Sequence, residues 1–312
     1  MVKKQPDFAE YIKPLNMNGL EGRMLRLPAQ KKRAKREILF IYGQHSSIER
    51  WRGLAEEFSK FGNLTMPDLP GMGGMESFYK LGQAASIDNH ADYLAAFMKL
   101  KFSRKQVTII GMSLGFVIVT RMLQRHPELT KRVDMLVSIV GLAHAEDFIF
   151  SRRRHFFYHY GAAFFSLRLP AYVFRKLFLR PGYLRRVYAH SFNAKEKFER
   201  LSGDEFERTM DTEIQLWQIN DIRSQMKTSY EMLTLDNTKV RVNLPVHHVV
   251  AKHDRYFNNV KVEEHMRRIF SDFRLFYSVA PSHAPTIVAD AKTAAPFIPP
   301  ALRKLLAKAP SA

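Results

Sequence analysis

The sequence contains no cysteine among its 312 residues. That absence excludes disulfide scaffolds, thiol nucleophiles, iron–sulfur clusters and zinc sites with cysteine ligands. The sequence also lacks an uninterrupted apolar run of about 18 residues, the length that a membrane-spanning helix needs. Residues 1–7 do not lead into the apolar segment of a signal peptide. We therefore expect a cytoplasmic protein without a transmembrane helix.

Acidic residues are scarce relative to basic ones. The chain has 30 Asp and Glu against 49 Lys and Arg, which gives a formal net charge of +19. Such an excess is typical of proteins that meet anionic lipids, nucleic acids or acidic substrates, although a basic proteome produces it as well. Apolar residues at 46% and charged residues at 25% are ordinary globular values. We expect one folded domain that carries an insertion.

Short apolar runs alternate with helical patterns along most of the chain. This alternation is typical of a parallel sheet with crossover helices, so the predicted fold class is α/β with a mostly parallel central sheet flanked by helices. The clearest helical patterns cover residues 87–100 and 114–125. The predicted strands are residues 38–42, 63–66, 107–110, 135–140, 246–251 and 273–277.

About a hundred residues separate the fourth and fifth predicted strands, far more than a crossover requires. We therefore predict a core in two parts, residues 1–144 and 244–312, and an inserted helical cap over residues 145–243. Within residues 151–200 the sequence has 12 Lys and Arg, 2 Asp and Glu, and 13 Phe and Tyr. The predicted cap is thus both basic and aromatic.

The segment Gly111-Met112-Ser113-Leu114-Gly115 fits the pattern G-x-S-x-G at the junction of a predicted strand and a predicted helix. Glycines at these positions allow the strand and the helix to approach closely, and the turn holds the serine in a strained conformation with its hydroxyl exposed. The free N–H groups at the start of the helix point to where an oxyanion would form. Ser113 is therefore the candidate nucleophile.

A serine nucleophile needs a base and usually a carboxylate that orients the base. Asp254 follows the predicted strand 246–251, and His283 follows the next predicted strand. The order Ser, Asp, His and the short step from Asp254 to His283 fit one crossover between neighbouring strands. Ser113, Asp254 and His283 form the predicted catalytic triad.

These motifs together resemble the α/β-hydrolase-fold family over residues 20–143 and 244–300. Tyr42-Gly43-Gln44 is similar to the His-Gly-x oxyanion loop of that family, with Tyr42 where a histidine is usual, and residues 68–73 resemble its Asp-x-Pro-Gly-x-Gly turn. The resemblance implies that the backbone N–H groups of Gln44 and Leu114 form the oxyanion hole. Because some hydrolases of this fold place the acid after an earlier strand, Asp147 stays an alternative to Asp254.

A serine at residue 113 implies acyl transfer, since an aspartate there would indicate a dehalogenase or an epoxide hydrolase of the same family. We predict a serine esterase or lipase-like enzyme that acts on a fairly hydrophobic ester and needs no cofactor or metal. An acyl-thioesterase or acyltransferase with the same triad is the main alternative. A catalytically silent scaffold is less consistent with a complete triad.

The resemblance also implies that the cap supplies much of the substrate pocket, with Phe156, Phe157, Phe164 and Phe165 as candidate substrate-binding residues. Packing of the cap against the core is the alternative role of its aromatic residues. Flanking arginines suggest a second hypothesis, peripheral docking of the cap on an anionic membrane. Nucleic acid is not an expected partner, because the chain has no recognisable binding motif besides the basic run 31–36.

Overall fold

The computed structural model describes residues 7–31, 34, 36–103, 105–190, 203–252, 254–280, 283–285 and 290–308. Its centre is an eight-stranded sheet with the strand order β1-β2-β4-β3-β5-β6-β7-β8. From β4 through β8 all neighbouring strands are parallel, whereas β1, β2 and β4 pair in antiparallel fashion. The strands are β1 (Ile12–Met17), β2 (Leu20–Leu27), β3 (Arg36–Ile41), β4 (Gly62–Pro67), β5 (Val107–Met112), β6 (Val133–Ile139), β7 (Val242–Val250) and β8 (Phe270–Tyr277).

The predicted fold class is confirmed, and the six predicted strands correspond to β3 through β8. The sequence reading missed β1 and β2, the hairpin at one edge of the sheet. These two strands carry charged residues such as Lys13, Glu21 and Arg23 on partly exposed positions. An edge hairpin buries only part of its side chains, so it lacks the continuous apolar run by which buried parallel strands are recognised.

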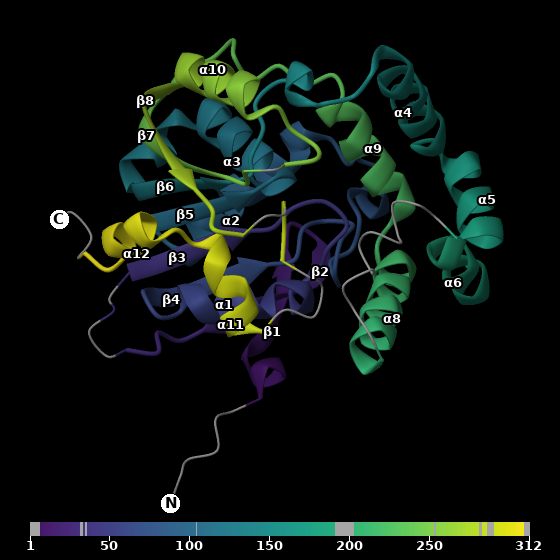
Figure 1. Ribbon diagram of the computed structural model, residues 1–312, viewed down its shortest axis with the longest axis horizontal. Helices are drawn as coiled ribbons and strands as arrows, with labels where there is room; N and C mark the ends of the chain where they lie inside the picture. Colours follow the sequence, from purple (N-terminus) through teal and green to yellow (C-terminus); the bar gives the residue numbers. More distant parts are fainter. Residues whose placement is uncertain are drawn as a thin grey trace, which may run out of the picture.

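Helices pack in pairs around the sheet. Helix α1 contacts α11 and β4, α2 contacts α3, and α10 contacts β8. Figure 1 shows α10 at the end of the sheet formed by β7 and β8, and α1 and α11 near β4. The core helices are α1 (Arg52–Phe58), α2 (Ile87–Lys101), α3 (Leu114–Arg125), α10 (Asn259–Ile269), α11 (Ala291–Ala294) and α12 (Pro300–Leu306). Short 3-10 helices are η1 (Phe8–Tyr11), η2 (Glu49–Trp51), η3 (Phe78–Leu81), η4 (Pro127–Arg132), η5 (Ala145–Asp147) and η6 (Ala295–Phe297).

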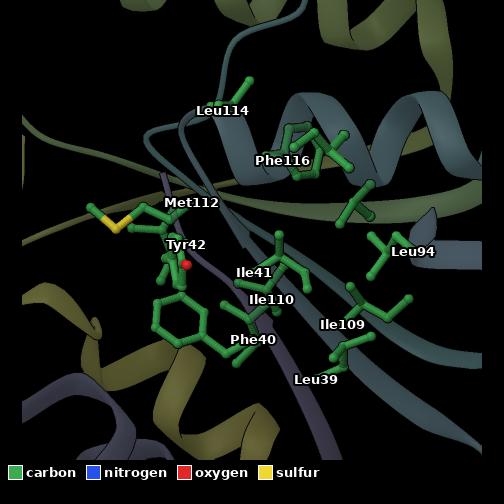
Figure 2. Close-up of a cluster of buried hydrophobic side chains, with 14 of the residues drawn as sticks. Leu39, Phe40, Ile41, Tyr42, Leu94, Ile109, Ile110, Met112, Leu114 and Phe116 are labelled. Carbon is green, nitrogen blue, oxygen red and sulfur yellow. The ribbon is translucent and has the colours of Figure 1, made fainter. Parts of the chain in front are cut away.

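The hydrophobic core lies on the central strands. Every residue of β5 is buried, as are Phe40 and Ile41 of β3, which pair with it. Figure 2 shows Phe40, Ile41 and the β5 side chains Ile109, Ile110 and Met112 together with Leu94 of α2 and Phe116 of α3. The loops that follow β3 and β5 therefore begin at buried, closely packed strands.

In the described part of the chain, five α-helices lie between β6 and β7 in the sequence, where the cap is predicted. They are α4 (Arg152–Phe165), α5 (Arg168–Phe178), α6 (Pro181–His190), α8 (Asp204–Ile219) and α9 (Ile222–Met232). A separate small core joins α5, α6 and α8 through Ala171, Leu184, Met210 and Ile214, and α4 contacts α5 and α9. Figure 1 shows the five helices at one side of the molecule, with α4, α5 and α6 outermost. The exact domain boundaries stay a prediction.

The basic run 31–36 is not a uniform surface loop. Arg36 is the first residue of β3 and is buried, where it forms an ion pair with Asp134 and donates to the backbone oxygens of Leu306 and Lys308. Lys32, Arg33 and Lys35 lie outside the described residues. Among the described residues, no helix is long and apolar enough to cross a membrane.

Candidate active site

Ser113 lies on the sharp turn between β5 and α3. Its backbone has φ +50° and ψ −121°, a strained conformation that non-glycine residues rarely adopt. The turn can form only because its glycines lack a side chain. A Cβ on Gly115 would lie 2.2 Å from the carbonyl oxygen of Ile41, and one on Gly111 would lie 2.7 Å from the Cα of Phe116. Ser113 itself is half-buried between buried neighbours, so its hydroxyl is held at the rim of the sheet.

Asp254 and His283, separated by α10 and β8 in the chain, meet as the sequence predicts. The Nδ1 atom of His283 lies 2.7 Å from Oδ2 of Asp254. The other carboxylate oxygen of Asp254 accepts the N–H groups of Tyr256 (2.8 Å) and Phe257 (3.2 Å). The Asp254 side chain is 2% exposed and that of His283 is 15% exposed. Because the carboxylate holds Nδ1–H, the lone pair of His283 is on Nε2, the atom that a general base requires.

The alternative acid, Asp147, has a different partner. It is completely buried, and its Oδ1 lies 2.6 Å from Nδ1 of His265 on α10. Its Oδ2 accepts the N–H groups of Ala143 (2.7 Å) and His144 (3.0 Å). Both oxygens of Asp147 are therefore engaged in holding the segment after β6, whereas Asp254 holds His283.

The predicted oxyanion donors lie on two neighbouring turns. Gly43 packs directly against the nucleophile, because a Cβ there would lie 3.1 Å from Cβ of Ser113 and 3.7 Å from its Oγ. Leu114 is the first residue of α3, where a backbone N–H has no acceptor within the helix. In the part of the chain that the structure describes, neither the N–H of Gln44 nor that of Leu114 has a hydrogen-bond partner. Two unused donors thus lie on the loops that flank Ser113.

The Gln44 side chain forms contacts that the sequence did not reveal. Its Nε2 donates to the backbone oxygen of Gln225 (2.8 Å) and to Oγ of Ser229 (2.9 Å), and its Oε1 accepts from the Thr228 hydroxyl (2.9 Å). All three partners are on α9. The loop that carries one predicted oxyanion donor is therefore fixed to the inserted helices.

Tyr42, the departure from the family pattern, supports the neighbouring turn. Its hydroxyl donates to Oδ1 of Asp68 (2.7 Å) and accepts the N–H of Leu69 (3.0 Å). Burial raises the pKa of Tyr42 well above its ordinary value, so it stays a neutral donor. Asp68 also accepts from Arg23 (2.7 Å), while burial raises its pKa to about 6. Gly73, with φ +67°, packs so closely on Asp68 that no side chain would fit.

The four predicted substrate-binding aromatic residues do not line an enclosed pocket in this structure. Phe156, Phe157 and Phe164 are 56%, 71% and 55% exposed, and Phe165 is half-buried. The Phe156 ring contacts Phe157, and the Phe165 ring contacts Phe164 and Phe174 of α5. A role in substrate binding stays a prediction for these residues.

One group of potential metal ligands could not be recognised from the sequence, because one of its three residues is far from the other two in the chain. His144, Glu146 and His265 have ligand atoms within 4.8 Å of one another. However, Nδ1 of His144 accepts the N–H of Glu146 at 3.1 Å. A neutral imidazole has one nitrogen lone pair, so His144 has none left for a metal in this arrangement. The donor set does not fit a metal ion without breaking that contact.

Comparison with known proteins identifies the family of the chain. The alpha/beta hydrolase fold family matches residues 37–284, so the chain belongs to that family. No curated protein sequence matches the chain.

Several solved structures share the fold at low sequence identity. A bacterial membrane phospholipase A is 14% identical, with a TM-score of 0.63 over 96% of this chain and 87% of its own. N-formylmaleamic acid deformylase from Pseudomonas putida S16 is 16% identical, with a TM-score of 0.57 over 87% of this chain and 94% of its own. The N-acyl homoserine lactonase AidH is 14% identical, with a TM-score of 0.57 over 87% of this chain and 90% of its own. The family and these neighbours support a hydrolase.

Proposed function

We propose that the protein is a serine hydrolase that cleaves a carboxylic ester of a fairly hydrophobic substrate through Ser113, His283 and Asp254. The observation that carries the proposal is the 2.7 Å contact between His283 and Asp254. It occurs in a family member whose G-x-S-x-G serine has the strained backbone of a nucleophile turn.

In the proposed acylation step, Ser113 Oγ attacks the ester carbonyl carbon while His283 Nε2 takes its proton. Asp254 keeps the proton on Nδ1 and stabilises the imidazolium that forms. The negative charge that develops on the carbonyl oxygen is stabilised by the N–H groups of Gln44 and Leu114. His283 then gives its proton to the leaving alcohol, and the acyl group stays on Ser113.

Deacylation repeats the sequence with water as the nucleophile. His283 Nε2 takes a proton from water, the resulting hydroxide attacks the acyl carbon, and Ser113 leaves with the proton that His283 returns. Asp254 holds the ring orientation in both steps. Its second oxygen is fixed by two backbone N–H groups, which is why the carboxylate has no freedom to turn away.

The hydrophobic substrate class is supported by the surroundings of the site. The rings of Tyr256 and Phe257 contact the His283 ring, so apolar groups lie beside the proposed base. Two structural neighbours, the phospholipase A and the lactonase, have names that imply ester substrates. At their low identity they support the fold and make ester chemistry the first reaction to test.

The test is a panel of p-nitrophenyl esters of increasing acyl length, compared with acyl-CoA thioesters of the same chains. We expect kcat/KM for the esters to rise with chain length and to exceed that for the thioesters. Ser113→Ala should abolish turnover while leaving the unfolding temperature unchanged. Preference for thioesters, or for an added alcohol acceptor over water, would instead establish the thioesterase or acyltransferase alternative. Full activity of Ser113→Ala would refute the proposed mechanism.

A further inference from the structure

The outermost inserted helices expose an unusual number of large apolar side chains. Of the 22 exposed large apolar residues in the described part of the chain, 13 lie between residues 156 and 187. We call this set the exposed aromatic surface. It consists of Phe156, Phe157, Tyr158, Tyr160, Phe164, Leu167, Leu169, Tyr172, Val173, Leu177, Phe178, Tyr183 and Val187. Scattered exposed apolar residues are normal, but a concentration of this kind marks an interaction site.

In α5 the spacing of the exposed apolar residues shows that a whole face of the helix is exposed to solvent. In α5, Leu169, Tyr172 and Val173 recur at the spacing of one helix face, and Leu169 is 71% exposed. The only buried residue of α5 is Ala171. A surface helix of a globular protein normally turns its apolar face to the core. Here the large apolar side chains are turned outward.

Helices α4, α5 and α6, which carry most of the exposed aromatic surface, contain basic residues and no acidic ones. Residues 151–190 contain nine Arg and Lys and no Asp or Glu. Arg152 and Arg153 begin α4, Arg168 begins α5, and Lys176 is near the end of α5. Arg185 is paired with acidic residues of α8, so it contributes less to the surface charge. Basic residues therefore flank the apolar faces at both ends of α5.

We propose that the exposed aromatic surface docks on an anionic phospholipid bilayer, with its aromatic side chains at the headgroup level and the flanking arginines on lipid phosphates. Basic residues beside exposed aromatic rings are the pattern of interfacial helices. A second copy of this chain is a poor occupant, because a symmetric contact would bring two positively charged surfaces together. Binding of nucleic acid would use the basic residues but would not explain why so many apolar side chains are exposed. The proposal rests on this surface and not on the proposed enzymatic activity.

The first measurement is co-sedimentation of the Ser113→Ala variant with vesicles, so that no lipid is hydrolysed. Vesicles of phosphatidylcholine alone are compared with mixed phosphatidylcholine and phosphatidylglycerol vesicles. We expect binding to the anionic vesicles and strong weakening between about 0.1 M and about 1 M salt, because the screening length falls from roughly 10 Å to 3 Å. Equal binding to neutral and anionic vesicles, or no binding to either, would overturn the proposal.

A charge variant tests the arginines. Each basic residue near an anionic surface contributes about fivefold to binding, so removing three should weaken it by on the order of a hundredfold. The test variant is Arg152→Gln, Arg153→Gln and Arg168→Gln combined. The matched control removes three exposed basic residues elsewhere, in Arg26→Gln, Arg241→Gln and Lys304→Gln combined. An equal effect of the two variants would show that net charge, and not this surface, drives binding.

An apolar variant tests insertion. Phe157→Ser combined with Leu169→Ser removes two side chains that are each 71% exposed. The control, Val260→Ser combined with Tyr277→Ser, removes side chains that are 77% and 64% exposed on the core domain. Only the first pair should reduce vesicle binding.

Three further outcomes separate this inference from its alternatives. Dimers that form in the absence of vesicles and dissociate in the Phe157→Ser, Leu169→Ser variant would identify a second copy as the occupant and overturn membrane docking. Unchanged hydrolysis of a short soluble ester by the combined Arg152→Gln, Arg153→Gln and Arg168→Gln variant is expected, because none of these residues belongs to the proposed catalytic or substrate-binding site. Vesicle binding by a chain that hydrolyses no ester would refute the proposed function and leave the docking surface intact.

Discussion

The side chain of Gln44 offers a sharp test of how the oxyanion loop is positioned. Replacing it in Gln44→Leu removes three hydrogen bonds to α9 and retains the backbone N–H that is the proposed oxyanion donor. Each such bond contributes about 0.5–1.5 kcal/mol net, so the free energy of unfolding should fall by roughly 2–3 kcal/mol.

The effect on catalysis follows from the same contacts. Loss of a whole oxyanion donor costs about 10²–10³ in kcat. Because Gln44→Leu displaces the donor without removing it, we expect kcat to fall by about tenfold to a hundredfold. KM should change little, since the loop acts on the charge that develops in the transition state.

A second glutamine provides a matched control. Gln124 on α3 donates to the backbone oxygens of Asn237 and Val240, both at 2.7 Å, and neither acceptor belongs to the oxyanion loop. Gln124→Leu should lower the unfolding free energy in urea to a comparable degree and leave kcat for a p-nitrophenyl ester unchanged. A wild-type kcat in Gln44→Leu, or an equal loss in both variants, would refute the positioning role of Gln44.

Three other predictions concern the site and the core. Asp254→Asn should lower kcat for ester hydrolysis by up to roughly 10⁴-fold. Asp147→Asn should lower the unfolding temperature and leave kcat within a few-fold of the wild-type value. The reverse pattern would assign the catalytic acid to Asp147. Burial lowers the pKa of His248 to about 3, below about 6.5 in the unfolded chain. As the pH falls, the unfolded chain therefore binds a proton at this histidine before the folded chain does, and the free energy of unfolding decreases. Between pH 7 and pH 5 this decrease should be about 2 kcal/mol smaller in His248→Gln than in wild type. Equal decreases for the two proteins in urea titrations would contradict this. Gly115→Ala should abolish activity and destabilise the fold by about 1–3 kcal/mol. The control Gly161→Ala, where a new Cβ meets nothing within 4 Å, should raise the unfolding temperature slightly. Wild-type activity and stability of Gly115→Ala would contradict the close packing described for the turn at Ser113.

Much of the parallel sheet could be predicted because its strands are buried on both faces. The predicted helix 114–125 has the observed bounds of α3, because the turn at Ser113 fixes its start and His126-Pro127 ends it. The hairpin of β1 and β2 could not be recognised in the same way, because its stability depends on pairing with β4 and not on a continuous apolar run.

At the site, local motifs predicted local structure well. The spacing of Asp254 and His283 predicted their contact, because one crossover between neighbouring parallel strands brings the ends of those strands together. The anchoring of Gln44 by α9 could not be predicted, since its partners are more than 180 residues away in the chain. The exposure of Phe157 and Leu169 was equally hidden, because apolar periodicity shows that a helix has an apolar face but not what covers it.

The most direct test of the proposed mechanism is intact-mass spectrometry after treatment with a fluorophosphonate, which reacts with activated serines. Wild-type protein should gain a single adduct, and Ser113→Ala should gain none. His283→Ala should react far more slowly, because the hydroxyl then has no base. An adduct that persists in Ser113→Ala, or a wild-type protein that stays unlabelled with and without anionic vesicles, would contradict the assignment of Ser113 as an activated nucleophile.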